Sequence, residues 1–130
     1  MNTVKDTLRS TVHVTFDGRV IKQFRGPQAL ERFLNEVKVL RYLEIKSCFF
    51  VSRLLEVDEL ELKIVTTNCG SRVEHIDAKR QKELFEDLEK YGVHHEDPDK
   101  RNITYHQQEG RFCIIDFEFA SILEKPLHER

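Results

Sequence analysis

The sequence lacks long apolar runs. None approaches the ~20 apolar residues of a membrane-spanning helix, and Met1 to Ser10 is polar and charged, unlike a signal peptide. A long basic stripe is also missing, and the formal net charge is −2, which does not favour charge-driven binding of nucleic acid. We therefore expect a cytoplasmic protein that binds neither membranes nor nucleic acid.

Cysteine is scarce as well. The three cysteines, Cys48, Cys69 and Cys113, are widely spaced and lie in apolar stretches. They form no C-x-x-C pair of the kind that holds zinc. We predict that all three are reduced, buried thiols.

The residues that are present are enough for one core. A length of 130 residues predicts a single domain, and 39% hydrophobic with 34% charged residues predicts a densely charged surface around that core. Periodicity predicts a mixed α+β chain. The predicted elements in chain order are a hairpin over Val12–Phe24, a helix that Pro27 opens, strand-like runs over Phe49–Val57 and Leu60–Thr67, a helix over Asp77–Tyr91, a polar loop over Val93–Arg101, and a hairpin that joins Ile103–Tyr105 to Phe112–Ile115.

The first predicted helix carries a carboxylate beside its apolar face. The apolar stripe consists of Leu30, Phe33, Leu34, Val37, Leu40 and Leu43. Glu36 lies on the flank of this stripe, where a partly desolvated carboxylate requires a cation. Lys22, on the second strand of the first hairpin, is a candidate partner.

The last predicted hairpin brings polar side chains together. Asn102 precedes its first strand and Asp116 follows its second, so antiparallel pairing places both at one end. Asp97 lies on the loop that enters this end, and Glu118 is close by in sequence. Converging carboxylates repel one another unless a hard divalent cation binds, and oxygen ligands suit magnesium. The alternative is that these acids are ordinary turn residues.

The order of these residues resembles the protein-kinase-like superfamily. The run His95-Glu96-Asp97-Pro98-Asp99-Lys100-Arg101-Asn102 matches the catalytic loop H-x-D-x-x-x-x-N, and Ile115-Asp116-Phe117-Glu118 stands where kinases have D-F-G. Val20-Ile21-Lys22 matches the strand lysine and Glu36 its helix partner. The Asp-Phe-Glu variant resembles choline, ethanolamine and aminoglycoside kinases, and the run from Gly92 to Asp97 resembles short fungal kinase-like proteins.

This resemblance implies a fold. It covers Val12 to about Leu123, and implies a protein-kinase-like α+β fold within a single minimal domain, residues 1–130. Residues 12–67 would form a small antiparallel N-lobe sheet plus one helix. Residues 68–123 would form a much reduced C-lobe with the catalytic loop and a β-hairpin, and residues 124–130 a solvated tail.

The resemblance also implies catalytic roles. Lys22 would hold the α- and β-phosphates of ATP, and Glu36 would fix Lys22 through an ion pair. Asp97 would orient the attacking hydroxyl and accept its proton. His95 would brace the loop by hydrogen bonding, and a zinc site formed by His94, His95 and an aspartate is an alternative for that histidine pair.

Cofactor sites follow from the same resemblance. Asn102 and Asp116 would coordinate Mg²⁺, with Glu118 as a further metal ligand. Thr66 to Cys69 would occupy the place of the hinge, so that Thr67 and Cys69 would bind the adenine.

Two features of the family pattern are missing. No glycine-rich loop precedes Val12, and the sequence ends fourteen residues after Asp116, which leaves no room for an activation segment or a large helical lobe. The substrate is then small, or a partner chain or dimer completes the lobe, or catalysis has been lost. We expect a minimal Mg-ATP-dependent phosphotransferase that acts on a hydroxyl of a small molecule or protein. The alternatives are a pseudokinase that serves as a protein-binding module and an unrelated α+β domain.

Overall fold

The fold is α+β, with two helices and three antiparallel sheets among the described residues. A computed structural model describes residues 2–123 of the chain. The first half of the chain contains β1 (Asn2–Asp6), β2 (Ser10–Val14), β3 (Val20–Phe24), α1 (Ala29–Ile45), β4 (Leu54–Asp58) and β5 (Lys63–Thr66). The second half contains β6 (Ser71–Arg72), α2 (Ala78–Lys90), β7 (Val93–His94), a short 3₁₀ turn (Lys100–Asn102), β8 (Ile103–His106), β9 (Arg111–Ile114) and β10 (Ser121–Ile122).

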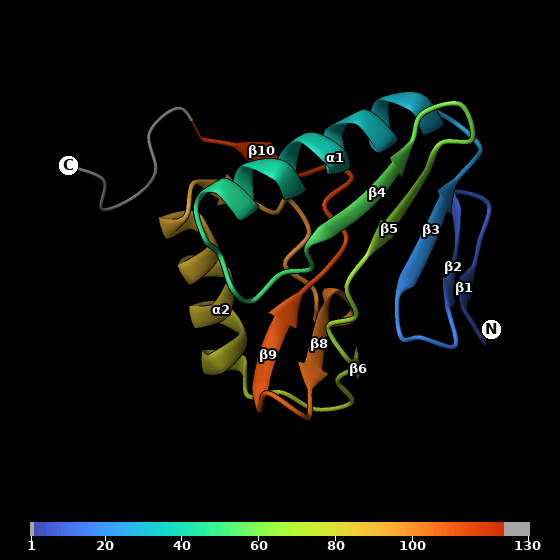
Figure 1. Ribbon diagram of the computed structural model, residues 1–130. Coiled ribbons are helices and arrows are strands. Elements are labelled where there is room, and N and C mark those ends of the chain that lie inside the picture. The colour runs from blue at the N-terminus through green and yellow to red at the C-terminus, as the bar shows by residue number, and fades with distance from the viewer. Residues whose placement is uncertain (1, 124–130) are drawn as a thin grey trace.

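The sheets divide the molecule into two halves. The larger sheet has the order β1-β2-β3-β5-β4, and α1 packs on its β3 and β4 strands. A three-stranded sheet of order β6-β8-β9 and helix α2 form the other half (Figure 1). The short β7 and β10 strands pair with each other. Strand β10 leads back toward α1, so the chain after β9 returns to the first half (Figure 1).

One core runs through both halves. Its largest fully buried side chains are Phe33, Phe117, Leu43, Ile64, Leu88, Ile103 and Ile114. Phe24 of β3 meets Phe33 of α1 edge-to-face, with ring centroids 5.6 Å apart. Because the buried residues of α1, α2, β8 and β9 belong to the same cluster, the two halves are packed against each other rather than merely linked.

Local signals account for several elements. The β2–β3 turn contains Asp17 and Gly18, and Gly18 takes a φ of 82° that favours glycine. Helix α2 begins where the Asp77 side chain accepts a hydrogen bond from the Lys79 N–H at 2.7 Å. It ends before Gly92, which has a φ of 100°. The predicted first hairpin, second helix and last hairpin are confirmed.

Strand β1 was not predicted. It pairs antiparallel with β2 and forms the edge of the larger sheet. Its sequence, Asn2 to Asp6, is polar because an edge strand needs few apolar residues. The sheet therefore begins about ten residues earlier than the expected start at Val12.

The orientation of α1 also differs from the prediction. Leu30 and Leu34 are about half exposed, whereas Arg32, Glu36 and Val39 are buried. The helix is thus rotated so that a face with two charged residues points inward. It begins at Ala29 rather than at Pro27 because Gln28 takes a left-handed conformation with a φ of 58°.

Two predicted strands are shorter than expected. Strand β4 begins at Leu54, since Phe50 and Val51 fill the core from an irregular segment. Strand β5 begins at Lys63, after a turn in which Leu62 has a φ of 53°. The predicted loop over Val93–Arg101 contains the short β7 strand and part of the 3₁₀ turn.

Three further predictions concern the cysteines, membrane-spanning helices and the C-terminal tail. Cys48, Cys69 and Cys113 are free and buried, as predicted. Among the described residues, neither helix has the length and apolar character needed to cross a bilayer. The predicted tail, residues 124–130, lies outside the described residues.

Candidate functional site

A cavity of about 350 Å³ lies between the larger sheet and the β8–β9 hairpin. Its volume is within the range of small-molecule sites. Five predicted site residues line it: Lys22, Glu36, Cys69, Asn102 and Asp116. The other three, Asp97, Thr67 and Glu118, are not among the lining residues.

The walls of the cavity are apolar and its deep end is charged. Strands β2, β3 and β5 contribute Val12, Val14, Val20 and Ile64. Ile114 and Ile115 contribute from the opposite side. Such a combination of apolar walls and a few polar groups is typical of sites for small ligands.

Lys22 and Glu36 form the predicted ion pair. The Lys22 Nζ donates to the Glu36 Oε1 at 2.7 Å, and both side chains are buried. Burial alone lowers the pKa of Lys22, but the carboxylates of Glu36, Asp116 and Glu118 outweigh it and hold that pKa above its ordinary value. Burial raises the pKa of Glu36, an effect that Lys22 opposes. Lys22 is therefore a permanent cation at this end of the cavity.

Glu118 bridges Lys22 and a second buried cation, Arg32. Its Oε2 lies 2.8 Å from the Lys22 Nζ, and its Oε1 lies 2.7 Å from Nη1 of Arg32. The side chains of Arg32 and Glu118 are only 3% and 4% exposed. Arg32 also donates to the backbone carbonyls of Pro27, Arg9 and Arg25. Both oxygens of Glu118 are thus occupied by cations of the protein itself.

Helix α1 is tied to the segment after β9 at two more points. The Glu36 Oε2 accepts a hydrogen bond from the Phe117 N–H at 3.0 Å. The Asn35 Nδ2 lies within 3.0 Å of the Glu118 and Ala120 carbonyl oxygens, and 3.4 Å from that of Phe117. Together these contacts fix α1 relative to residues 117–120.

Asp116 is held in an uncommon backbone conformation. Its φ is 67°, in the left-handed region that non-glycine residues rarely adopt and that is concentrated at functional sites. Its Oδ1 lies 3.5 Å from Lys22 and its Oδ2 lies 3.7 Å from Lys5. Burial alone raises the pKa of Asp116, but Lys22, Lys5 and hydrogen bonds at Glu118 outweigh it and lower that pKa to about 2. Asp116 is therefore a carboxylate at neutral pH.

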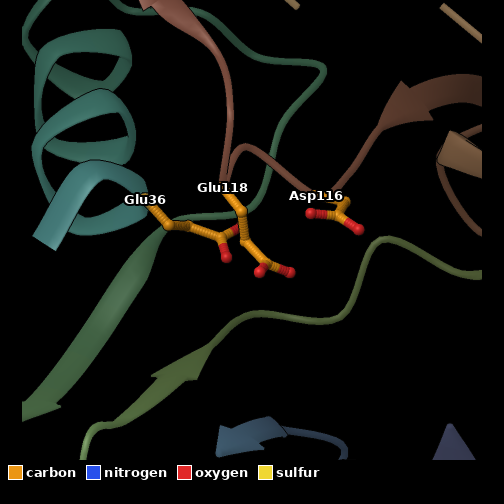
Figure 2. A group of neighbouring side chains, drawn as sticks. All are labelled: Glu36, Asp116 and Glu118. Carbon is orange, nitrogen blue, oxygen red and sulfur yellow. The ribbon is translucent and has the colours of Figure 1, made fainter. Parts of the chain in front are cut away.

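Three carboxylates lie near one another, Glu36 from α1 and Asp116 and Glu118 from the segment after β9 (Figure 2). One oxygen from each lies within 4.8 Å of the others. Of the three, Asp116 is the most exposed, at 28%. Oxygen ligands suit Mg²⁺, and Asp116 has the carboxylate most open to the cavity. Both oxygens of Glu118 already pair with cations of the protein. The role of Glu118 as a metal ligand stays a prediction.

The predicted catalytic loop is braced by His95. The His95 Nε2 donates to the Ile115 carbonyl at 2.9 Å, while Nδ1 accepts from the Asp97 N–H at 3.2 Å. These two partners require the neutral imidazole with its proton on Nε2. The predicted bracing role is confirmed, and the loop is thereby joined to the residue that precedes Asp116.

Asp97 is held by Asn102 and Arg101. The Asn102 Nδ2 donates to both the Asp97 carbonyl and its Oδ2, at 3.0 and 3.1 Å, and Arg101 donates to the same Oδ2. Glu96, just before Asp97, has a φ of 77°. The Asp97 side chain is 45% exposed, so the loop presents a half-exposed carboxylate beside the cavity rather than inside it.

The hairpin prediction for Asn102 is also confirmed at the backbone. Ile103 pairs with Ile114, and the Ile115 N–H donates to the Asn102 carbonyl at 2.9 Å. Asn102 and Asp116 both line the cavity at the same end of this hairpin. Their joint role in holding a metal stays a prediction.

The segment Thr66–Cys69 follows β5 along the cavity. The Thr67 N–H donates to the Arg53 carbonyl at 3.0 Å, and the Thr67 hydroxyl accepts from the Arg53 N–H. Thr67 therefore braces this segment, while Thr66 and Cys69 line the cavity. The Cys69 carbonyl accepts from the Thr104 hydroxyl at 2.7 Å.

Cys69 is a perturbed thiol. Its Sγ lies 3.2 Å from the Ser52 hydroxyl. A hydrogen bond from Cys113 is the largest cause that lowers the pKa of Cys69 to about 7, against the effect of burial. Burial instead raises the pKa of Cys48 to about 12.

Sequence reasoning missed three cations of the site: Lys5, Arg32 and Arg101. Arg32 lies one helical turn before Glu36. Residues four apart in a helix lie on the same face, so their spacing could have indicated that Arg32 is buried beside Glu36. Arg101 directly precedes Asn102, inside the H-x-D-x-x-x-x-N run. Lys5 had no signal, because its strand was not predicted.

No protein-family model matches the chain, and no curated protein matches it.

Proposed function

We propose that this chain is a minimal phosphotransferase of protein-kinase-like architecture that uses Mg²⁺ and ATP. The observation that carries the proposal is the Lys22–Glu36 ion pair beside Asp116, at the charged end of an apolar cavity. Lys22 comes from the third strand, Glu36 from the helix after it, and Asp116 from the residues after a later hairpin. Phosphoryl transfer depends mainly on positioning and charge neutralisation, which such a set supplies.

The cavity suits a nucleotide. The apolar side chains of Val12, Val20, Ile64 and Ile114 line it, and such apolar walls favour contact with a purine ring. The backbone of Cys69, beyond β5, would pair with the base edge. Lys22, at the charged end, would then contact the phosphates.

The donor set at the charged end fits a magnesium ion. Asp116 remains ionised because its pKa is lowered to about 2, and the Asn102 side chain would supply an amide oxygen as a second ligand. Both residues line the cavity. A bound Mg²⁺ would neutralise the phosphate charge, and the protein would supply its position through the rigid backbone at Asp116.

Asp97 would serve the acceptor. Arg101 and Asn102 hold its Oδ2, and its partial exposure leaves room for a hydroxyl-bearing substrate. As a general base it would accept the proton of that hydroxyl. Because it lies beside the cavity, a small molecule or an exposed side chain of a partner protein could reach it.

Thermal unfolding with and without Mg-ATP tests the proposal. A ligand at 100 times its dissociation constant adds about 2.7 kcal/mol of stability, which corresponds to roughly 10 °C for a domain of this size. We expect such a shift with Mg-ATP and a slow ATP turnover that Asp97→Ala and Asp116→Ala each abolish. Lys38→Ala, an exposed change on α1, is the control. No thermal shift at millimolar Mg-ATP contradicts the proposal.

A nucleotide-binding pseudokinase that acts through a partner protein is the second candidate. It is favoured by Glu118, whose two oxygens bind Lys22 and Arg32, and by the position of Asp97 outside the cavity lining. This candidate predicts a thermal shift with ATP but no turnover in any acceptor mixture. The function would then depend on a dimer or on a complex with a partner chain, and sedimentation analysis would detect that assembly.

A further inference from the structure

We propose that Lys5 is a phosphate-binding residue of this site and supplies the contact that a glycine-rich loop would otherwise make. This inference rests on the proposed nucleotide site and adds a residue to it. Lys5 lies on β1, lines the cavity, and forms an ion pair with Asp116.

An irregularity in β1 turns Lys5 toward the cavity. Thr3 pairs with His13, so regular pairing would place Lys5 opposite Thr11. The register shifts between Thr3 and Lys5, and Lys5 instead pairs with Val12. A shift of one residue moves a side chain to the other face of a sheet, and bulges commonly re-aim side chains next to active sites.

The shift places Lys5 in the same cross-strand row as Lys22. Val12 pairs with Lys22, and Lys22 pairs with Ile64. Directly paired residues of antiparallel strands have their side chains on one face. Lys5, Val12, Lys22 and Ile64 all line the cavity, which agrees with that row. Two lysines therefore lie on one face of the sheet, with strand β2 between them.

The two lysines flank Asp116 from opposite sides of its carboxylate. Lys22 lies 3.5 Å from Oδ1, and Lys5 lies 3.7 Å from Oδ2. These separations exceed the length of a good N–H···O hydrogen bond. Lys5 is also 24% exposed, so it can exchange Asp116 for an anionic ligand at little cost.

Lys22 alone has little capacity left for phosphate. Its ammonium already lies 2.7 Å from Glu36 and 2.8 Å from Glu118. Among residues 2–123, the ion pair that Lys5 forms is with Asp116, whose side chain is 28% exposed. A third basic residue of the cavity wall, Arg72, lies on β6 and pairs with Thr104, away from the lysine row.

The turn between β1 and β2 does not cover the cavity. The Arg9 carbonyl accepts hydrogen bonds from the Arg25 N–H at 2.8 Å and from Arg32 at 3.2 Å. At Gly26, a Cβ atom would lie 2.4 Å from the Leu8 carbonyl oxygen. The turn is therefore packed onto the segment before α1, and the N–H groups of Thr7, Arg9 and Ser10 already donate within the turn itself.

The balance of charges also supports a role for Lys5 in phosphate binding. The charged groups at this end sum to zero, with three cations and three carboxylates: Lys5, Lys22, Arg32, Glu36, Asp116 and Glu118. Loss of Lys5 would leave one net negative charge facing an anionic ligand. Such a change weakens binding of phosphates but not of an uncharged nucleoside.

Calorimetric titration of Mg-ATP and of adenosine tests the role of Lys5. We expect Lys5→Gln to weaken Mg-ATP binding about tenfold and to leave adenosine binding unchanged. Lys5→Arg should keep most of the ATP affinity, because the charge is kept. Lys38→Gln, an exposed lysine change on α1, should match the wild type with both ligands.

The outcomes separate this inference from the proposed function. If the wild type binds no Mg-ATP, the nucleotide site itself is wrong and the role of Lys5 fails with it. If the wild type binds Mg-ATP and Lys5→Gln binds it equally well, or loses adenosine to the same extent, only the role of Lys5 is overturned.

A second measurement uses the unaltered protein. Amine labelling followed by mass spectrometry reports the reactivity of each lysine. Mg-ATP should protect Lys5 from the reagent, adenosine should not, and Lys38 should react equally in every sample. Equal labelling of Lys5 with and without Mg-ATP overturns the inference even if Lys5→Gln does not fold.

Discussion

The buried ion pair between Arg32 and Glu118 can be measured with a double-mutant cycle. The changes are Arg32→Met and Glu118→Gln, alone and together, and the measured quantity is the free energy of unfolding in urea. Each single change removes one partner from a buried charge, and breaking a buried pair in this way costs about 3–5 kcal/mol. The double change removes both charges, so it should cost clearly less than the sum.

The structure sets the size of the expected coupling. The Nη1–Oε1 distance is 2.7 Å and the two side chains are 3% and 4% exposed. With an effective dielectric constant near 20 and charge centres about 4 Å apart, the attraction is about 4 kcal/mol. Since Glu118 also pairs with Lys22, the cycle isolates the share that belongs to Arg32. We expect a coupling of about 3 kcal/mol.

A matched pair on the surface provides the control. Arg19 and Glu56 have the same residue types and a similar separation, 2.9 Å, but their side chains are 44% and 63% exposed. Exposed pairs contribute about 0.2–1 kcal/mol, so the cycle Arg19→Met with Glu56→Gln should give a small value. Equal coupling energies in the two cycles would refute the claim that burial makes the Arg32–Glu118 pair strong.

Three further predictions concern acidity, thiol reactivity and backbone geometry. Because the pKa of Asp116 is lowered from 3.8 to about 2 in the folded state, its charge stabilises the fold above pH 4 by about 2 kcal/mol, and this stabilisation is lost as the pH falls through 2. The urea midpoint of Asp116→Asn should therefore fall less steeply with acid than that of the wild type, and equal pH dependence of the two midpoints contradicts the assignment. Iodoacetamide at pH 7.5 should label Cys69 before Cys48, and Mg-ATP should slow the labelling of Cys69 alone, as peptide mass analysis would report; the reverse order would show that the cavity does not expose Cys69. Gly70→Ala should destabilise the fold by several kcal/mol, roughly the largest class of point-mutant effects, because a Cβ would lie 2.0 Å from the Tyr105 carbonyl oxygen. The control, Gly18→Ala, meets no atom within 4 Å and should cost only the strain of its positive φ. Equal unfolding midpoints for the two variants would count against the close packing at Gly70.

Short-range patterns predicted the local elements well. The first hairpin, the second helix and the last hairpin are each encoded by patterns within the element itself, so the sequence alone was sufficient. The Lys22–Glu36 pair was also predictable, because a partly desolvated carboxylate beside an apolar stripe needs a cation.

The rest depended on packing that no local pattern encodes. Arginine is rarely fully buried unless it is paired, and the partner of Arg32 is Glu118, 86 residues later in the chain. The inward face of α1 follows from that pair, so the apolar stripe misplaced Leu30 and Leu34. Lys5 reaches the cavity through an irregular register in β1, which sequence periodicity does not reveal.

The amide of Asn35 has a consequence for the kinetics of ligand exchange. Its contacts to the carbonyls of Glu118 and Ala120 join the helix to the segment after β9, and Glu36 adds a second contact at Phe117, which lines the cavity. A site held at these points opens little, so ligand association should follow a single exponential whose rate constant rises linearly with ligand concentration. A slow phase independent of ligand concentration would mean that Asn35 releases its carbonyls before the ligand enters.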